Sequence, residues 1–136
     1  MTSTINTEVL IAGAGPTGLA LACQFLRYGV DFVLCEAKAA ITPYSKAIGV
    51  QARTLEIYEQ IGLAQPLIAQ GTKAEKAQLW EGGAVRGEIE LATIGQGLSP
   101  YPFLLLVEQS EHERILHNFL KSHGQDVQWQ TELVDF

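Results

Sequence analysis

The first 36 residues alternate between apolar runs and glycine-rich breaks. Residues Thr7–Ala12 are β-branched and apolar, which is typical of a buried strand. After three glycines, the apolar positions follow the i, i+3, i+4, i+7 spacing of one helix face: Leu19, Ala22, Cys23 and Leu26. Gly29 is placed to end this helix in the left-handed conformation, and the apolar run Asp31–Glu36 predicts a second strand. Strand, helix and strand within about 30 residues form a βαβ unit with parallel strands.

The middle of the chain reads as a loop, a helix and a hairpin. Residues Ala37–Gly49 are broken by a proline and predict a loop, and Gln51–Ile61 predicts a helix that ends at Gly62. Between Ala77 and Thr93, apolar and charged residues alternate around the turn Gly82–Gly83, which predicts a β-hairpin.

The last third of the chain predicts strand, helix and strand. Phe103–Glu108 is an apolar strand, and Ser110–Glu113 ("SEHE") has the spacing of a capping box that opens a helix ending at Gly124. The core face of that helix comprises Ile115, Leu116, Phe119 and Leu120. Alternation over Val127–Leu133 predicts a final strand. The expected fold class is α/β: a Rossmann-like βαβ domain with a parallel sheet and an inserted β-hairpin.

Composition narrows the classes of partner. A chain of 136 residues with 47% hydrophobic and 18% charged content is typical of one soluble domain. A net charge of -6 argues against nucleic acid or an anionic membrane as the main partner. Val9–Leu26 carries no charge, but Pro16, three glycines and the preceding Glu8 argue against a membrane span or signal peptide. We therefore expect a cytoplasmic chain without membrane or nucleic-acid partners.

The cysteines and histidines show no metal-binding pattern. Cys23 and Cys35 have neither the spacing of a metal knuckle nor that of a redox pair, so we expect two buried, reduced thiols. His112, His117 and His123 have spacings that place no two on one helix face, and we expect solvated helix residues without a catalytic or metal role.

The motif Gly13-x-Gly15-x-x-Gly18 lies directly after a predicted strand and before a predicted helix. Gly13 allows a tight turn, Gly15 lets the backbone approach a pyrophosphate, and Gly18 lets the helix pack closely on the strand. The free N–H groups of the helix N-terminus attract the anion. Glu36 follows at the end of the second strand, where a carboxylate binds the ribose hydroxyls and repels a 2′-phosphate. The pattern predicts a dinucleotide with a free 2′-hydroxyl, FAD or NAD rather than NADP, against the alternative of a purely structural glycine turn.

Two further blocks favour FAD over NAD. Together with the glycine motif, "SKAIGVQARTLEIYEQIGL" (residues 45–63) and "LLLVEQSEHERIL" (residues 104–116) resemble the class A flavin-dependent aromatic hydroxylases of the para-hydroxybenzoate hydroxylase type. The resemblance implies that Arg53 leans over the flavin diphosphate and that Gln109 touches the FAD chain; from the residues alone, both would be ordinary helix and strand-end positions. Lys46 stands where many members have arginine and offers a point charge without a bidentate fork. The cofactor-binding set implied by the resemblance is Gly13, Ala14, Gly15, Pro16, Thr17, Gly18, Glu36, Ala37, Lys46, Gln51, Arg53 and Gln109.

The resemblance implies an FAD-dependent monooxygenase, an oxidoreductase that hydroxylates an aromatic, phenol-like substrate with NADPH or NADH as transient reductant. No catalytic base is identified. The family's later Asp-Gly and Gly-Asp pairs are absent, because Asp31, Asp126 and Asp135 precede Phe, Val and Phe. We therefore expect residues 1–136 to be the truncated N-terminal part of an FAD-binding domain, with 72–101 an inserted hairpin segment.

Alone, such a chain is expected to be inactive and to self-associate or to need a missing C-terminal part, because a truncated parallel sheet exposes an edge and an apolar face. Two other functions stay open: a non-catalytic ADP- or dinucleotide-binding module, and the NAD-binding domain of another dehydrogenase.

Overall fold

The computed structural model describes residues 4–44 and 49–135, and the chain divides into two compact units. Unit 1 comprises Met1–Tyr44 and Gln109–Phe136, and unit 2 comprises Ser45–Glu108. Within the described ranges, no helix is both long enough and apolar enough to cross a bilayer.

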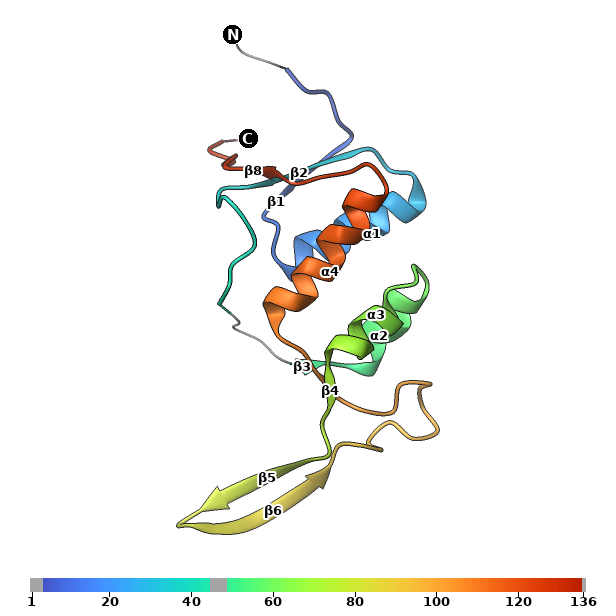
Figure 1. Ribbon diagram of the computed structural model, residues 1–136, viewed down its shortest axis with the longest axis vertical. Helices are drawn as coiled ribbons and strands as arrows, with labels where there is room; N and C mark the ends of the chain where they lie inside the picture. The colour runs from blue at the N-terminus through green and yellow to red at the C-terminus, as the bar shows by residue number, and fades with distance from the viewer. Residues whose placement is uncertain (1–3, 45–48, 136) are drawn as a thin grey trace. The chain divides into compact units, whose positions relative to one another are not determined.

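Unit 1 is the predicted βαβ arrangement with one more helix and strand (Figure 1). Its elements are β1 (Val9–Ala12), α1 (Pro16–Tyr28), β2 (Phe32–Glu36), α4 (Gln109–Ser122) and β8 (Gln128–Trp129). The sheet order is β1-β2-β8, and both pairs are parallel. Gly29 ends α1 with a φ of 68°, the left-handed conformation that the sequence predicts there. The α/β fold class with a parallel sheet is therefore confirmed.

Helices α1 and α4 lie side by side and cover one face of this sheet (Figure 1). On the covered face, Ile11 and Leu34 are register partners and both are buried. Between the two helices, the Cys23 thiol donates a hydrogen bond of 3.7 Å to the carbonyl of Leu116. Cys23 and Cys35 are free and buried, as predicted, and burial raises the pKa of the Cys23 thiol to about 12.

The opposite face of the sheet carries an apolar groove. Leu10 and its register partner Val33 point away from the helix-covered face, because side chains alternate along each strand. They line an apolar groove of about 260 Å³, and Leu10 is exposed. Parallel sheets are normally covered on both faces, and among the described residues of unit 1 this face is lined by strand residues and by the segments that flank β1 and β8. An apolar part of the sheet is therefore exposed, as the sequence analysis expected.

Unit 2 contains two short helices and two small antiparallel sheets. Its elements are β3 (Gly49–Val50), α2 (Ala52–Glu59), α3 (Ala64–Gln70), β4 (Thr72–Lys73), β5 (Lys76–Glu81), β6 (Ala84–Glu90) and β7 (Leu105–Leu106). One sheet has the order β3-β7-β4, and the other is the predicted hairpin β5–β6. Gly82 and Gly83 form its turn with φ of 60° and 78°, as a twisted two-residue turn requires.

Three elements of unit 2 are not predicted from the sequence. Strands β3 and β4 are two residues each and exist through their pairing with β7, which is remote in the chain. Helix α3 is seven residues long and carries Pro66 in its first turn, where proline is tolerated but reads as a loop signal.

The predicted capping box at Ser110–Glu113 is wrong. Helix α4 begins at Gln109, so Ser110 lies inside the helix and is buried. The carboxylate of Glu113 accepts a hydrogen bond of 2.7 Å from Nε2 of Gln109 instead. The earlier start therefore replaces a reciprocal cap by a side-chain pair at i, i+4.

The predicted final strand Val127–Leu133 is cut short at Trp129. Gln130 adopts a φ of 55°, and its N–H donates to the carbonyl of Lys38 at 2.9 Å. The N–H of Thr131 donates to the carbonyl of Glu36 at 2.9 Å. The left-handed residue therefore ends the strand, while the chain stays hydrogen-bonded to the segment at the end of β2.

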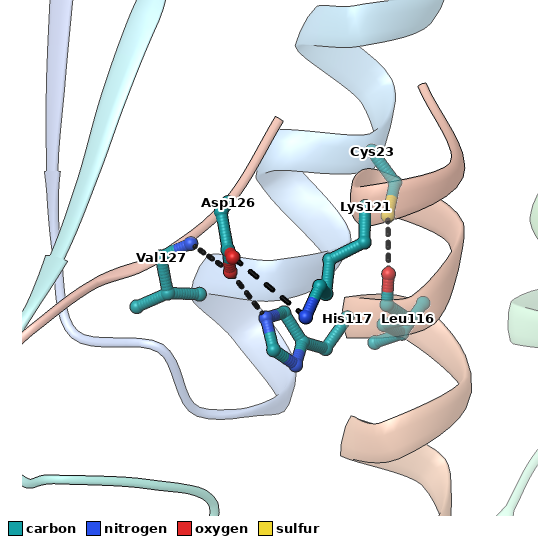
Figure 2. A network of polar contacts seen from close by, with 6 residues as sticks. All are labelled: Cys23, Leu116, His117, Lys121, Asp126 and Val127. Atoms are coloured by element: carbon teal, nitrogen blue, oxygen red, sulfur yellow. Dashed lines mark hydrogen bonds and ion pairs between the residues drawn. The ribbon is translucent and has the colours of Figure 1, made fainter. Parts of the chain in front are cut away.

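His117 is not the solvated residue that we expected. Its side chain is 14% exposed, and Nε2 lies 2.6 Å from Oδ1 of Asp126, as Figure 2 shows at the turn between α4 and β8. The ring also meets Trp129 edge-on, with centroids 5.5 Å apart. Asp126 further accepts the N–H of Val127 and lies 3.8 Å from Lys121 Nζ. The contact with His117, followed by that N–H, lowers the pKa of Asp126.

Candidate nucleotide-binding site

The turn between β1 and α1 needs two of its three glycines for its own geometry. Gly13 has a φ of 105°, which favours glycine, and its N–H donates to the carbonyl of Cys35 at 2.8 Å. A Cβ on Gly18 would lie 1.9 Å from the carbonyl oxygen of Gly13. Gly13 therefore makes the turn, and Gly18 lets α1 start close to β1.

Gly15 is different, because nothing in the part of the chain that the structure describes demands a glycine there. It occupies the N-cap position of α1, without a side chain that could cap the helix, and has a φ of -77°, which any residue can adopt. A Cβ built on it meets no heavy atom within 4 Å. The backbone thus borders open space at the position where a dinucleotide fold brings a pyrophosphate against the chain.

The N-terminus of α1 is ready to receive an anion. Within residues 4–44, no side chain caps this helix and no acidic residue lies in its first turn. Pro16 has no N–H to offer, so the first-turn donors are the N–H groups of Thr17 and Gly18. These donors and the positive end of the helix dipole fit a phosphate group.

Glu36, at the carboxyl end of β2, is held by backbone donors. Oε1 accepts the N–H of Lys38 at 3.0 Å, and Oε2 accepts the N–H of Ala14 at 2.9 Å. The bond from Lys38 and then that from Ala14 lower the pKa of the carboxyl. The side chain is therefore a fixed carboxylate tied to the glycine turn, and each oxygen keeps a lone pair for a ribose hydroxyl.

Gln109 lies at the same end of unit 1 as the glycine turn. Helices α1 and α4 each lead into a strand of the same parallel sheet, so the two helices run in the same direction (Figure 1). Cys23 lies seven residues into α1 and bonds to Leu116, which lies seven residues into α4. The first residues of the two helices, Pro16 of α1 and Gln109 of α4, therefore lie at the same height along the paired helices. Unit 1 thus brings together residues 13–18, Glu36, Ala37 and Gln109 at the carboxyl edge of its sheet, where such folds bind ligands.

The remaining predicted residues belong to unit 2. Gln51 is the N-cap residue of α2. Arg53, on the first turn of α2, is 77% exposed and pairs with Glu56 at 2.9 Å, while Glu56 also accepts the hydroxyl of Ser99 at 2.8 Å. Lys46 falls outside the described residues.

Sequence reasoning missed two contributors to this site. The N–H of Lys38 holds Glu36, and no sequence signal marks a backbone donor. Glu113 holds Gln109. The sequence shows this pair at the i, i+4 spacing, but the sequence analysis assigned Glu113 to a capping box with Ser110 instead.

Residues 6–136 match the model of a protein family described as "FAD binding domain". A flavin-dependent monooxygenase of Mycobacteroides abscessus is 33% identical over 135 residues, covering 94% of this chain and 28% of the relative. Pentachlorophenol 4-monooxygenase of Sphingobium chlorophenolicum is 30% identical over 131 residues, covering 95% and 24%.

Among solved structures, aklavinone-11 hydroxylase in a ternary complex with FAD and aklavinone shares the fold. Its TM-score is 0.84 at 23% identity, and the match covers 98% of this chain and 27% of that one. This chain thus spans roughly a quarter of the length of the relatives it matches.

Proposed function

This chain belongs to the FAD binding domain family, and from that membership we propose that it is the nucleotide-binding part of a monooxygenase that hydroxylates a phenol-like aromatic substrate. Its cofactor is FAD, and its relatives are flavin-dependent monooxygenases. When bound, FAD supplies the redox chemistry, with NADPH or NADH as the proposed reductant. The name of the pentachlorophenol-hydroxylating relative supports the phenol-like substrate.

The observation that carries this proposal is the open space beside Gly15 at the uncapped start of α1. The N–H groups of Thr17 and Gly18 would hold the pyrophosphate there, with Gly13, Ala14 and Pro16 shaping the turn. Glu36 would accept the hydroxyls of the adenosine ribose, next to Ala37.

Gln51, Arg53 and Lys46 are the proposed contacts from unit 2, with Gln109 on α4 as the contact to the FAD chain. Arg53 is accessible, and its bond to Glu56 uses one of five guanidinium donors, so others can reach a diphosphate. In this proposal both units are parts of one FAD-binding domain, and residues 72–101 are a segment inserted into it.

The test is equilibrium dialysis of the chain against FAD, ADP and NAD, read as bound ligand. We expect FAD and ADP to bind and NAD to bind no better than ADP. Gly15→Val should abolish binding, because a branched side chain would fill the phosphate space, while the free energy of unfolding stays unchanged.

Gly87→Val is the matched control, since a Cβ at Gly87 on the hairpin also meets no atom within 4 Å. It should leave binding intact. Undiminished binding by Gly15→Val would contradict the cradle, and a clear preference for NAD over FAD would favour a dehydrogenase domain instead.

We also propose that the apolar sheet face around Leu10 and Val33 associates with another copy when the chain is alone in solution, because an apolar face of this kind is rarely left in water. Sedimentation velocity over a range of concentrations should show mass increasing with concentration. A monomer at every concentration would contradict this.

A further inference from the structure

Glu113 is a buried acidic residue of unit 1 that contributes to the nucleotide site only through its contact with Gln109. It is 3% exposed and lies on the second turn of α4. A buried carboxylate needs hydrogen-bond donors to offset the loss of water. The structure supplies one from Gln109, whose Nε2 donates to Oε1 of Glu113 at 2.7 Å.

This bond decides which end of the Gln109 amide faces which way. A glutamine side chain has a donor end and an acceptor end, whereas a carboxylate can only accept. The amide nitrogen must therefore face Glu113, and the carbonyl oxygen on the same carbon faces away from it. In a variant without Glu113, the accept-only group that requires this orientation of the amide is gone.

The direction matters because Gln109 starts α4 level with the start of α1. A carbonyl oxygen cannot bond to the oxygens of a pyrophosphate, which are acceptors as well. It can accept from hydroxyl groups, and the ribityl chain of FAD carries hydroxyls beyond the pyrophosphate.

We propose that Glu113 is a positioning residue that turns the carbonyl of Gln109 toward the ribityl hydroxyls of FAD. This inference rests on the proposed function. It assigns Gln109 to the polyol part of the ligand rather than to its phosphates, so the pair acts on FAD and not on ADP.

The experiment compares the dissociation constants for FAD and ADP, measured on the full chain. Glu113→Leu removes the acceptor and places an apolar, helix-compatible side chain at the buried position. We expect it to weaken FAD binding about five- to tenfold relative to ADP, the size of one lost hydrogen bond. Gln109→Ala should lower the FAD-to-ADP preference equally, and the double variant no further.

The ratio of the FAD and ADP dissociation constants separates a positioning effect from a general one. A change in net charge or in stability alters both dissociation constants by the same factor and leaves their ratio unchanged. Glu111→Leu is the matched control: Glu111 is on the same helix and pairs with Arg114 instead. Its FAD-to-ADP ratio should equal that of the unchanged chain.

Two conservative variants test the orientation itself. Glu113→Gln has both a donor and an acceptor and can pair with Gln109 in either orientation, so the FAD preference should fall by about twofold, less than in Glu113→Leu. In the exchanged pair Gln109→Glu/Glu113→Gln, position 109 presents only acceptors, and the preference for FAD should survive. This exchange also tests the inference should Glu113→Leu not fold.

An equal loss of FAD and ADP binding in Glu113→Leu, or no loss, would overturn the inference. So would an unchanged chain that binds FAD no better than ADP, although nucleotide binding would then stand. Failure of the unchanged chain to bind either ligand would instead refute the proposed function.

Discussion

In the strand pair β1–β2, Ile11 and Leu34 are 6% and 1% exposed, whereas Leu79 and Ile89 of the hairpin β5–β6 are 68% and 58% exposed. Both pairs carry apolar residues, although the register of the hairpin shifts between Leu79 and Trp80 whereas that of β1–β2 is unbroken. The pair β1–β2 is covered by two helices: α1, which lies between the two strands in the chain, and α4, which follows them. An apolar pattern thus identifies a strand, but only a covering layer turns the pattern into a core.

The comparison is tested most strongly by truncating one leucine in each pair. Leu34→Ala should lower the free energy of unfolding by about 3–5 kcal/mol, because the side chain is fully buried and leaves a cavity. Leu79→Ala should cost less than about 0.5 kcal/mol. Urea unfolding followed by far-UV circular dichroism measures both. A large, concentration-dependent loss for Leu79→Ala would show that another copy covers the hairpin.

A methyl group added to one glycine in each region gives the next largest contrast. Gly18→Ala should destabilise the chain by about 3 kcal/mol, because its Cβ would overlap the backbone oxygen of Gly13. Gly87→Ala should be neutral or slightly stabilising, since the space is open and φ is not positive. Thermal unfolding of the two variants is the measurement. Equal stabilities would mean that the turn at Gly18 can open without cost.

Glu36 at the end of β2 and Glu88 on the hairpin are carboxylates with different hydrogen-bond donors. Backbone N–H groups fix Glu36, whereas the side chains of Gln78 and Lys76 lower the pKa of Glu88 on the hairpin. Glu36→Ala should weaken ADP binding by about 1.5–3 kcal/mol, as expected for hydrogen bonds to a charged group. Glu88→Ala should leave it unchanged. Isothermal titration calorimetry with ADP measures both affinities. Equal ADP binding by the two variants would show that Glu36 does not contact the nucleotide.

The smallest effect concerns acid stability at the α4–β8 turn. Asp126 has a lowered pKa in the folded chain, so it stabilises the fold above its unfolded pKa of about 3.9, and this contribution is lost as pH falls through the folded value. Because the side chain is half exposed, Asp126→Asn should cost well under 1 kcal/mol at pH 6.

The difference between Asp126→Asn and the unchanged chain should shrink toward pH 2, as urea midpoints across pH would show. Glu88→Gln on the hairpin serves as the comparison: side-chain contacts on an exposed surface lower its pKa too, and because water and salt screen them, its midpoint at pH 6 should change less than that of Asp126→Asn. A difference for Asp126→Asn that stays constant with pH would mean that the charge of Asp126 is not involved.

Local signals explain what could be predicted from the sequence. The βαβ unit, the end of α1 at Gly29 and the hairpin turn at Gly82–Gly83 follow from periodicity and glycine conformation, which depend on near neighbours. The glycine motif and Glu36 are likewise readable, since each stands at the end of a strand that its own residues predict.

Only the tertiary structure decided the features that depend on remote partners. Strands β3 and β4 exist through β7, and Gln130 ends β8 in a left-handed conformation beside Lys38. His117 is enclosed because Asp126 and Trp129 return to it after the helix.

The same holds for the pair Gln109 and Glu113. The local sequence is compatible with a capping box of Ser110 and Glu113 or with an i, i+4 contact of Gln109 and Glu113. Because α4 starts at Gln109, the structure contains the i, i+4 contact. In the structure α4 packs against α1, where Cys23 meets Leu116. Short-range preferences differ by fractions of a kcal/mol, whereas burial of a helix face contributes several, so packing fixed the register that the sequence left open.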